Sequence, residues 1–241
     1  SITSILAFGM TFVLLTGGID LSVGSVTALA SVFAAYVGVE GRGFSLGMCF
    51  VTAMLVGLLC GTINGIGVAF VKLPPFIMTL GMMNVARGAA KVFTGGVPIF
   101  GLIDGFAYVA SAKLLGIPNL VYYMAAIFAV SYIVLRHTVY GRRIYSIGGN
   151  IEAARLSGIN VKTHIMSVYM ISGMLGGLCG MLLASRITSG NPTAADAYEM
   201  DAIAAAVIGG VSMTGGLGNV AGTLIGAIIL IIIDRKSTRL N

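Results

Sequence analysis

Apolar residues fill most of this chain, in stretches that glycine, proline or a few polar residues separate. The stretches 5–15 and 202–210 are short, and we interpret them as half-helices or as parts of spans broken at glycine. Several of the others approach or exceed the length of about 20 apolar residues that a helix needs to cross a bilayer. The pattern predicts an all-α, polytopic transmembrane bundle with about six or seven crossings. The candidate helices cover residues 5–15, 26–39, 44–71, 76–93, 119–135, 165–185, 202–210 and 220–233.

Composition supports a membrane protein and excludes an ordinary soluble domain. Hydrophobic residues make up 57% of the chain and charged residues 9%, with a mean hydropathy of +1.01, whereas charged residues are roughly a quarter of a soluble domain. Glycine recurs at four-residue spacing at Gly57, Gly61 and Gly65 and again at Gly173 and Gly177. Small residues at this spacing let membrane helices pack closely, so we expect a packing role. The cysteines lie in apolar stretches without metal-like spacing, so we expect no metal site.

The basic residues are concentrated in one loop, and this asymmetry predicts the orientation in the membrane. Residues 136–164 hold most of the arginines in the middle of the chain against a single acid. Cytoplasmic loops carry an excess of lysine and arginine, so we expect this loop in the cytoplasm, and the net charge of +6 does not indicate nucleic acid. Counting along the chain then puts residues 72–75 on the same side and residues 40–43, 101–118 and 186–199 outside.

The segment 16–25, Thr-Gly-Gly-Ile-Asp-Leu-Ser-Val-Gly-Ser, places polar residues between two apolar stretches. A carboxylate such as Asp20 is costly in hydrocarbon and indicates a functional or polar site inside a membrane bundle. Gly17, Gly18 and Gly24 let the backbone leave helical geometry, which is tolerated at membrane depth only inside protein or beside a wet cavity. We therefore expect Asp20 on a polar path through the bundle. The alternative is a helix end at the membrane surface that Asp20 caps.

A second segment repeats this pattern near the other end of the chain. Residues 207–216 align with residues 15–24 through the shared pattern Gly-Gly-(Ile/Val)-x-(Leu/Met)-(Ser/Thr)-x-Gly. Paired interruptions in corresponding places are typical of transporters built from repeats, whose path lies at the repeat interface. A chance match in glycine-rich apolar sequence is the alternative.

The basic loop also contains a short candidate helix. Asn150 can cap its amino-terminal end, Glu152 in the first turn complements the helix dipole, and Gly158 ends it. This helix is amphipathic and lies on the side expected to be cytoplasmic. A short exposed helix with an apolar face suits docking into a groove of another protein, whereas a helix lying on the membrane surface is the alternative.

These motifs resemble those of a known family. The tripeptide Glu-Ala-Ala at 152–154, followed by Gly158, resembles the EAA loop of ATP-binding-cassette importer permeases. Together with the segments 17–25, 155–161 and 201–210, it resembles the ribose-type monosaccharide permeases. The resemblance covers nearly all of the chain except its last eight residues, although the Ile-x-Leu-Pro ending of the wider EAA pattern is absent after Gly158.

The resemblance implies a multi-pass permease of the bacterial inner membrane. It implies a cytoplasmic ABC ATPase that binds ATP and Mg²⁺, a periplasmic sugar-binding protein, a second permease subunit that is commonly an identical copy, and further helices before and after this chain. The permease itself is then not an enzyme and holds no cofactor, and the chain contains no G-x-x-x-x-G-K-[ST] phosphate loop. The residues expected in the ATPase-coupling loop are Gly149, Asn150, Glu152, Ala153, Ala154, Arg155 and Gly158.

We expect ATP-driven movement of the partners to push on this loop and to shift the helices around the two glycine segments. A sugar is neutral, so hydroxyl and amide side chains matter more than charge along its path. Arg87 is expected to face protein or water, with a simple anchor at the membrane interface as the alternative. The expected contacts to the binding protein are Asp196, Glu199 and Asp201, with ordinary solvated loop acids as the alternative. The expected residues of the translocation path are Gly17, Gly18, Asp20, Ser22, Gly24, Ser25, Asn64, Arg87, Gly209, Gly210, Thr214 and Asn219.

Two other functions fit the residues less well. An ion-coupled secondary transporter would use Asp20 as its coupling carboxylate, and gradient-driven uptake without an ATPase would favour it. An intramembrane enzyme would need catalytic acids or a nucleophile, but the chain has no Gly-x-Gly-Asp or Gly-x-Ser-Gly element.

The domain organisation is simple. We expect residues 1–233 to form one transmembrane domain, and residues 234–241, where the sequence turns abruptly polar, to be a non-native tail outside the fold.

Overall fold

The computed structural model describes residues 1–238, and it describes side chains as far as residue 233. Residues 239–241 of the expected tail lie outside the described part. The described chain confirms an all-α fold, because its strands are limited to a two-stranded antiparallel hairpin. The elements are α1 (Ile2–Leu15), α2 (Val23–Val37), α3 (Leu46–Ala69), α4 (Pro75–Thr94), α5 (Tyr108–Ser111), β1 (Lys113–Leu114), β2 (Ile117–Pro118), α6 (Asn119–His137), α7 (Val139–Gly149), α8 (Ile151–Leu156), α9 (Val161–Ile187), α10 (Tyr198–Ile208) and α11 (Val220–Thr238).

Every apolar stretch identified in the sequence forms a helix, and two helices lie between the predicted ones. The helix α7 occupies part of the basic loop in which only one short helix was expected. Its buried side chains Ile144 and Ile147 are three residues apart, which places them on one face of the helix. The short helix α5 precedes the hairpin, whose turn residues Leu115 and Gly116 both have positive φ, as a two-residue type I′ connection requires.

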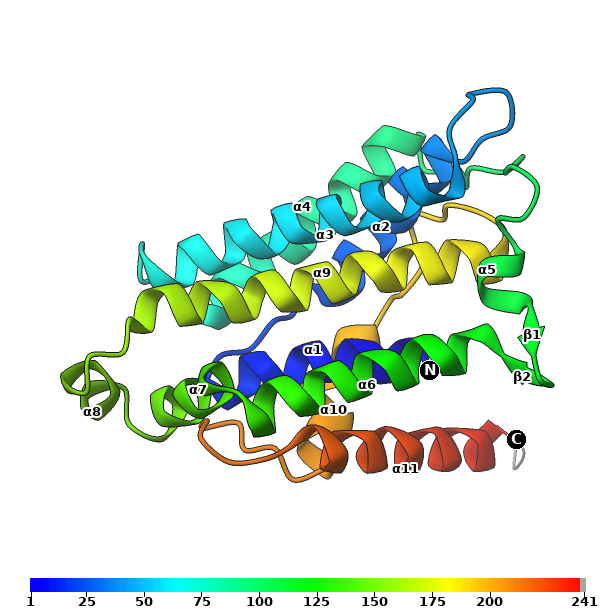
Figure 1. The fold of residues 1–241 in the computed structure, drawn as a ribbon. Helices are drawn as coiled ribbons and strands as arrows, with labels where there is room; N and C mark the ends of the chain where they lie inside the picture. Colours follow the sequence, from blue (N-terminus) through cyan, green and yellow to red (C-terminus); the bar gives the residue numbers. More distant parts are fainter. Residues whose placement is uncertain (239–241) are drawn as a thin grey trace.

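The helices α1 and α9 form the centre of the bundle. The 27-residue α9 packs against α1, α2 and α3, and α1 in turn contacts α6, α10 and α11. Nearly every residue of α1 is buried, and Figure 1 shows α6, α9, α10 and α11 arranged around it. A helix that is apolar all round fits only where protein or lipid surrounds it. The first of the two glycine segments therefore begins at the end of the most enclosed helix.

The glycines with four-residue spacing lie where α3 meets α9. A methyl group on Gly57 would overlap the carbonyl oxygen of Gly173, and one on Gly61 would overlap that of Tyr169. On the opposite helix, a methyl group on Gly177 would overlap the carbonyl oxygen of Ala53. The predicted packing role is confirmed, because the two backbones approach more closely than any side chain would allow.

The far side of α3 presents large apolar side chains to the surroundings. Leu55, Leu59 and Ile63 are 57%, 63% and 43% exposed. Within the described residues, α3, α6 and α9 are long and apolar enough to cross a membrane, while α1, α2 and the apolar part of α11 are shorter. Apolar surface of this extent suits contact with lipid rather than water, and the total number of crossings stays a prediction.

The loops gather at two opposite ends of the bundle, in the order that the sequence predicted. At one end, Val39 pairs with Leu102 and Ile99 with Gly190 in isolated β-bridges. At the other end, the ammonium group of Lys162 lies 5.7 Å from the centre of the Phe70 ring, and Figure 1 shows α8 projecting there. We call the second the α8 end, and its cytoplasmic location stays a prediction.

Candidate functional site

The first glycine segment is a non-helical crossing between α1 and α2, and its carboxylate is buried. Gly17 has a φ of +76°, which turns the chain out of α1 at no steric cost. The Asp20 side chain is 1% exposed. Its Oδ1 accepts hydrogen bonds from the backbone N (3.0 Å) and Oγ (2.6 Å) of Ser22, and its Oδ2 accepts one from Ser172 Oγ at 2.9 Å. These donors replace the water that a buried carboxylate loses.

Three neighbouring helices hold this segment in place. The amide nitrogen of Asn64 in α3 donates to Ser22 Oγ at 2.9 Å, and Tyr169 of α9 donates to the Ile19 carbonyl at 3.3 Å. Thr79 of α4 approaches the same carbonyl at 3.5 Å. The Oδ1 atom of Asn64 is buried and has no hydrogen-bond partner within the described residues. The non-helical backbone of this segment is thus buried in protein, beside Tyr169 and Ser172 of α9. The segment is part of a polar cluster inside the bundle.

The second glycine segment lies at the α8 end as a tight loop between α10 and α11. Gly210, Gly215 and Gly216 have positive φ values, and the Ser212 backbone N donates to the Leu217 carbonyl at 2.9 Å. The Thr214 side chain is exposed and bonds to Ser212 Oγ. The first segment is therefore buried inside the bundle, whereas the second lies at its surface. Both connect two helices, as the sequence repeat suggested.

The rest of the second segment secures the ends of α10 and α11. A methyl group on Gly209 would overlap the Gly222 carbonyl oxygen, so these helices also approach through glycine. The exposed Asn219 accepts a hydrogen bond from the Gly222 nitrogen at 2.7 Å and so caps α11.

The two segments meet at a backbone contact that we call the glycine junction, formed by Leu15, Gly17, Gly148, Gly215 and Gly216. The Gly216 nitrogen donates to the Leu15 carbonyl at 3.0 Å. A methyl group on Gly215 would lie 2.8 Å from the Gly17 nitrogen and 3.0 Å from the Gly148 Cα. A methyl group on Gly148 would overlap both the Leu15 oxygen and the Gly216 nitrogen. The end of α7 is therefore wedged between the two segments.

The sequence reasoning missed this role of Gly148. It identified both glycine segments and assigned the neighbouring Gly149 to the coupling loop, but it did not connect the three. The available signal was the Gly-Gly pair immediately before the Asn150 cap, because helix interiors seldom carry adjacent glycines without a close backbone contact.

The predicted short helix is present as α8 and has the predicted caps. Asn150 Oδ1 accepts hydrogen bonds from the backbone N of Glu152 and of Ala153, both at 3.0 Å. Gly158 follows the helix with a φ of +78°. Glu152 pairs with Arg155 at 2.9 Å on the exposed surface, a contact that contributes little by itself.

The helix α8 is anchored on one side and open on the other. Ala154 is fully buried against Ile147 and Val161, whereas Leu156 is 88% exposed. Together with Ile151, which is 41% exposed, it leaves apolar side chains of α8 uncovered by the rest of the described chain. Two residues of chain, Gly149 and Asn150, separate the start of α8 from Gly148 of the glycine junction.

Arg87 holds the non-helical segment that precedes α10, in which residues 192–197 form turns. Its Nη1 donates to the carbonyl oxygens of Pro192 (3.0 Å) and Ala194 (2.7 Å), and its Nη2 lies 3.9 Å from Asp196 Oδ1. Backbone carbonyls in a non-helical segment need such partners when water is scarce. Arg87 thus faces protein, as one of the two sequence alternatives expected.

We expect replacement of Arg87 by methionine to loosen this segment. The two carbonyl oxygens lose a charged donor, each loss costing about 1–3 kcal/mol where the group stays buried, so amide hydrogen exchange across residues 190–200 should become faster. Lys91→Met, one turn further along the same helix and exposed, is the matched control. Equal exchange rates in the two variants would contradict the fastening role.

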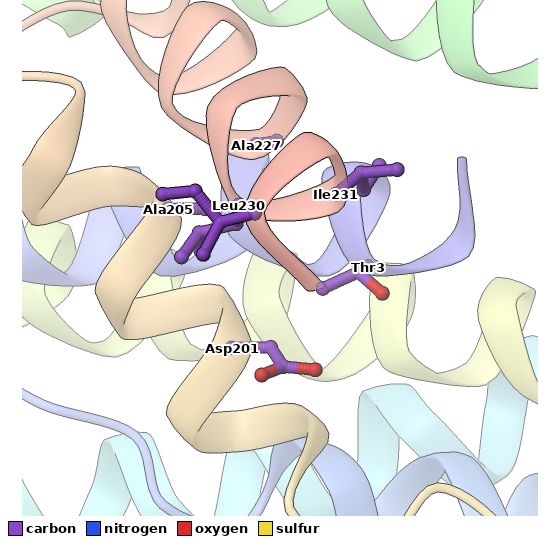
Figure 2. A pocket seen from close by; sticks show the side chains of 7 residues that line it. Thr3, Asp201, Ala205, Ala227, Leu230 and Ile231 are labelled. Atoms are coloured by element: carbon purple, nitrogen blue, oxygen red, sulfur yellow. The ribbon is translucent and has the colours of Figure 1, made fainter. Parts of the chain in front are cut away.

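The acids expected to contact a binding protein lie in three different environments. The Asp196 side chain is 91% exposed. Glu199 is 8% exposed and packs against Gly24 of α2, with an Oε2 atom that has no hydrogen-bond partner among the described residues. Asp201 lies in a cleft of about 460 Å³ between α1, α10 and α11. Figure 2 shows that apolar side chains form most of this cleft, whose lining residues are Thr3, Asp201, Ala205, Ala227, Leu230, Ile231 and Ile233.

Comparison with known proteins supplies the family. A family described as "Branched-chain amino acid transport system / permease component" matches residues 1–240. The chain is 46% identical to the ribose import permease protein RbsC of Haemophilus influenzae, over 95% of this chain and 72% of that protein. It is 44% identical to the RbsC protein of Bacillus subtilis, over 95% and 71%, and 34% identical to the xylose transport system permease protein XylH of Escherichia coli, over 100% and 77%. No solved structure matches the chain significantly.

Proposed function

Because this chain belongs to the family of branched-chain amino acid transport system permease components, we propose that it is the membrane-spanning subunit of an ATP-driven importer of a monosaccharide such as ribose. The observation that carries this proposal is the identity of 43–46% with ribose import permeases over 95% of the chain. The xylose permease is more distant, at 34%. A pentose is therefore the substrate class that the comparisons support best.

The proposed importer contains further components. An ATPase in the cytoplasm supplies the energy, a sugar-binding protein delivers the substrate from outside, and a second permease subunit, an identical copy, completes the membrane part in the bacterial inner membrane. The exposed apolar face of α8 at Leu156 supports a protein contact at this end. The exposed Asp196 is the acid best placed for the binding protein, whereas Glu199 is buried and Asp201 lies in the cleft between α1, α10 and α11.

We place the coupling pathway along α8, the end of α7 and the glycine junction. Movement of the ATPase shifts α8 through the exposed residues Glu152, Ala153 and Arg155, while Ala154 holds the helix against Ile147 and Val161. The backbone of Gly149 and Asn150 passes the movement to Gly148. Since Gly148 touches both Leu15 and Gly216, one displacement acts on both glycine segments at once. Packed contacts of this kind switch between discrete arrangements rather than deform continuously.

The sugar path follows the two segments in this proposal. Ser22, Ser25 and Asn64 are all buried, so the conformation described here closes the path at the first segment. The unpartnered Asn64 Oδ1 is an acceptor that a sugar hydroxyl can use once the segment moves. Thr214 and Asn219 are exposed at the α8 end and form the exit, with Gly17, Gly18, Gly24, Gly209 and Gly210 providing the flexible backbone.

The buried carboxylate fits an anchoring role in this path. Within the described residues, Asp20 accepts hydrogen bonds from Ser22 and Ser172, so it ties the start of α2 to α9. A secondary transporter would instead need Asp20 to exchange an ion or proton during each cycle. Uptake that persists without the ATPase and follows a proton or sodium gradient would favour that alternative.

The test is sugar uptake into proteoliposomes that contain the full-length permease, its ATPase and its binding protein. We expect uptake of labelled ribose that requires ATP and the binding protein, with xylose as a competitor. Leucine is the informative comparison, because the family description names branched-chain amino acids. Uptake of leucine but not of ribose would replace the proposed substrate class, and uptake driven by an ion gradient would replace the proposed energy source.

The variant Glu152→Lys should uncouple the α8 helix from the ATPase. It reverses a charge in the first turn of α8, where an acid is favourable, and removes the pair with Arg155. We expect ATP-driven uptake to fall roughly tenfold or more, as for a central interface residue, while membrane insertion is unchanged. Gly158→Pro should act alike, because proline cannot adopt the φ of +78° found there.

The control for this pair is Glu40→Lys, the same charge change on an exposed residue at the opposite end of the bundle. It should leave the ATP consumed per sugar unchanged. Wild-type uptake in both α8 variants would contradict the docking role of this helix.

A further inference from the structure

A cavity of about 320 Å³ opens at the α8 end, where α6 finishes, α7 begins and α11 begins. Its lining combines two arginines from different helices with two tyrosines and the apolar residues Leu135 and Val220. None of these side chains belongs to the proposed coupling pathway, and Asn219 alone among them belongs to the proposed sugar path. The lining residues are Tyr132, Leu135, Arg136, Arg142, Tyr145, Gly218, Asn219 and Val220.

The charge of this cavity is positive and uncompensated within the described residues. Arg136 and Arg142 are exposed, and the ion pairs of the described part involve other residues, Arg87 with Asp196 and Arg155 with Glu152. The Arg136 guanidinium lies 5.8 Å from the centre of the Tyr132 ring, within reach of a cation–π attraction. Two guanidinium groups that converge on one space suit an anion with several oxygen atoms, such as a phosphate group.

The rest of the cavity is held in a fixed shape. Tyr145 donates to the Gly218 carbonyl at 2.7 Å, which ties α7 to the loop before α11. Asn219 and Val220 place the amino-terminal end of α11 at the wall, and the positive end of a helix dipole adds to the attraction for an anion. The cavity is therefore present before any ligand binds.

The surroundings indicate an anion that carries apolar chains. Along α6, Val130 and Ile133 are 57% and 54% exposed, and along α11, Ile225 and Ile228 are 59% and 49% exposed. The two helices contact each other and run from the cavity toward the opposite end of the bundle. Acyl chains can lie along this surface while a headgroup occupies the cavity, an arrangement that free phosphate cannot use.

We propose that this cavity binds the phosphate headgroup of an anionic phospholipid in the leaflet at the α8 end. The assignment depends on the chain being embedded in a membrane and not on the transported substrate. Basic cavities between helices on the cytoplasmic side are a recurrent way to hold anionic lipids. Bound lipid would brace α7 next to the glycine junction.

The test compares lipid retention by the wild-type protein and the double variant Arg136→Gln/Arg142→Gln. Detergent-purified full-length protein is titrated with phosphatidylglycerol, phosphatidylcholine or inorganic phosphate and analysed by native mass spectrometry. Wild type should retain phosphatidylglycerol over phosphatidylcholine by roughly tenfold, as expected for two arginines near an anionic lipid, and the double variant should lose that preference. Arg143→Gln, an exposed arginine of α7 outside the cavity lining, should keep it.

Several outcomes would overturn the proposal. Equal retention of phosphatidylglycerol by wild type and the double variant would remove the arginines as the site. Equal retention of the two lipids by wild type would remove anion selection. Phosphate that competes away phosphatidylglycerol at equal concentration would replace the lipid by a soluble anion. A thermal melt without added lipid shows whether the double variant is folded, and if it is not, each single variant is measured in the same way.

Discussion

Replacement of Gly148 by alanine should strongly reduce ATP-driven sugar uptake in a protein that still reaches the membrane. The added methyl group would overlap the Leu15 carbonyl oxygen and the Gly216 nitrogen, both of which are backbone atoms that cannot rotate away. Overpacking a closely packed contact costs about 1–3 kcal/mol. About 1.4 kcal/mol of that cost, placed on the step that moves the junction, slows this step tenfold. We therefore expect uptake to fall by roughly tenfold or more.

The neighbouring glycine offers a matched control for this prediction. Gly149 belongs to the same helix end, but a methyl group there would meet nothing within 4 Å. Alanine favours a helix over glycine by roughly 1 kcal/mol at either position, so helix propensity cannot separate the two variants. The measurement is labelled sugar taken up per ATP hydrolysed in proteoliposomes. Indistinguishable ratios for Gly148→Ala and Gly149→Ala would show that the junction does not transmit the movement.

A reciprocal variant separates transmission from simple misfolding. A methyl group on Gly216 would lie 2.8 Å from the Gly149 nitrogen, closer than real contacts allow, and the φ of +73° at this position adds backbone strain for alanine. Gly216→Ala should therefore lower both the sugar carried per ATP and the melting temperature. If the melting temperature falls while the sugar carried per ATP stays at the wild-type value, the junction serves the fold rather than the coupling.

The sequence predicted the helices well because each is a local feature. Hydrocarbon-length apolar stretches must form helices in a bilayer, since no other backbone arrangement satisfies their hydrogen bonds there. The caps of α8 were equally local, because Asn150 and Gly158 act within one turn. The family resemblance rested on these same local motifs, and the comparisons confirmed it.

The sites depended on contacts that one-dimensional patterns do not contain. The repeat between the glycine segments correctly placed each between two helices, but Asp20 is buried inside the bundle and Thr214 is exposed at the α8 end. Tertiary packing decides that difference. The same holds for Glu199, whose place among the acids suggested a surface position, while the approach of α2 at Gly24 buries it.

The close approach of α3 and α9 should give the largest change in stability. In Gly57→Ala, the methyl group would overlap the Gly173 carbonyl oxygen and lie 2.7 Å from the Gly177 nitrogen. The helices must separate along their shared face, and the cost is about 1–3 kcal/mol or more because membrane helices associate mainly through such contacts. We expect the melting temperature of the purified protein in detergent to fall by roughly 5 °C or more.

The control for Gly57→Ala is Gly81→Ala in α4, where a methyl group would meet nothing within 4 Å. Because alanine is the better helix former, this variant should melt at the wild-type temperature or slightly above it. The melting temperature should therefore fall in Gly57→Ala but not in Gly81→Ala. The helix α9, which packs against Gly57, also contains Ser172, the hydrogen-bond partner of Asp20. It is the next helix after α8 in the chain. If both variants melt alike, the backbone approach between α3 and α9 does not hold the bundle, and the exposed side of α3 must be stabilised by lipid or by a second subunit instead.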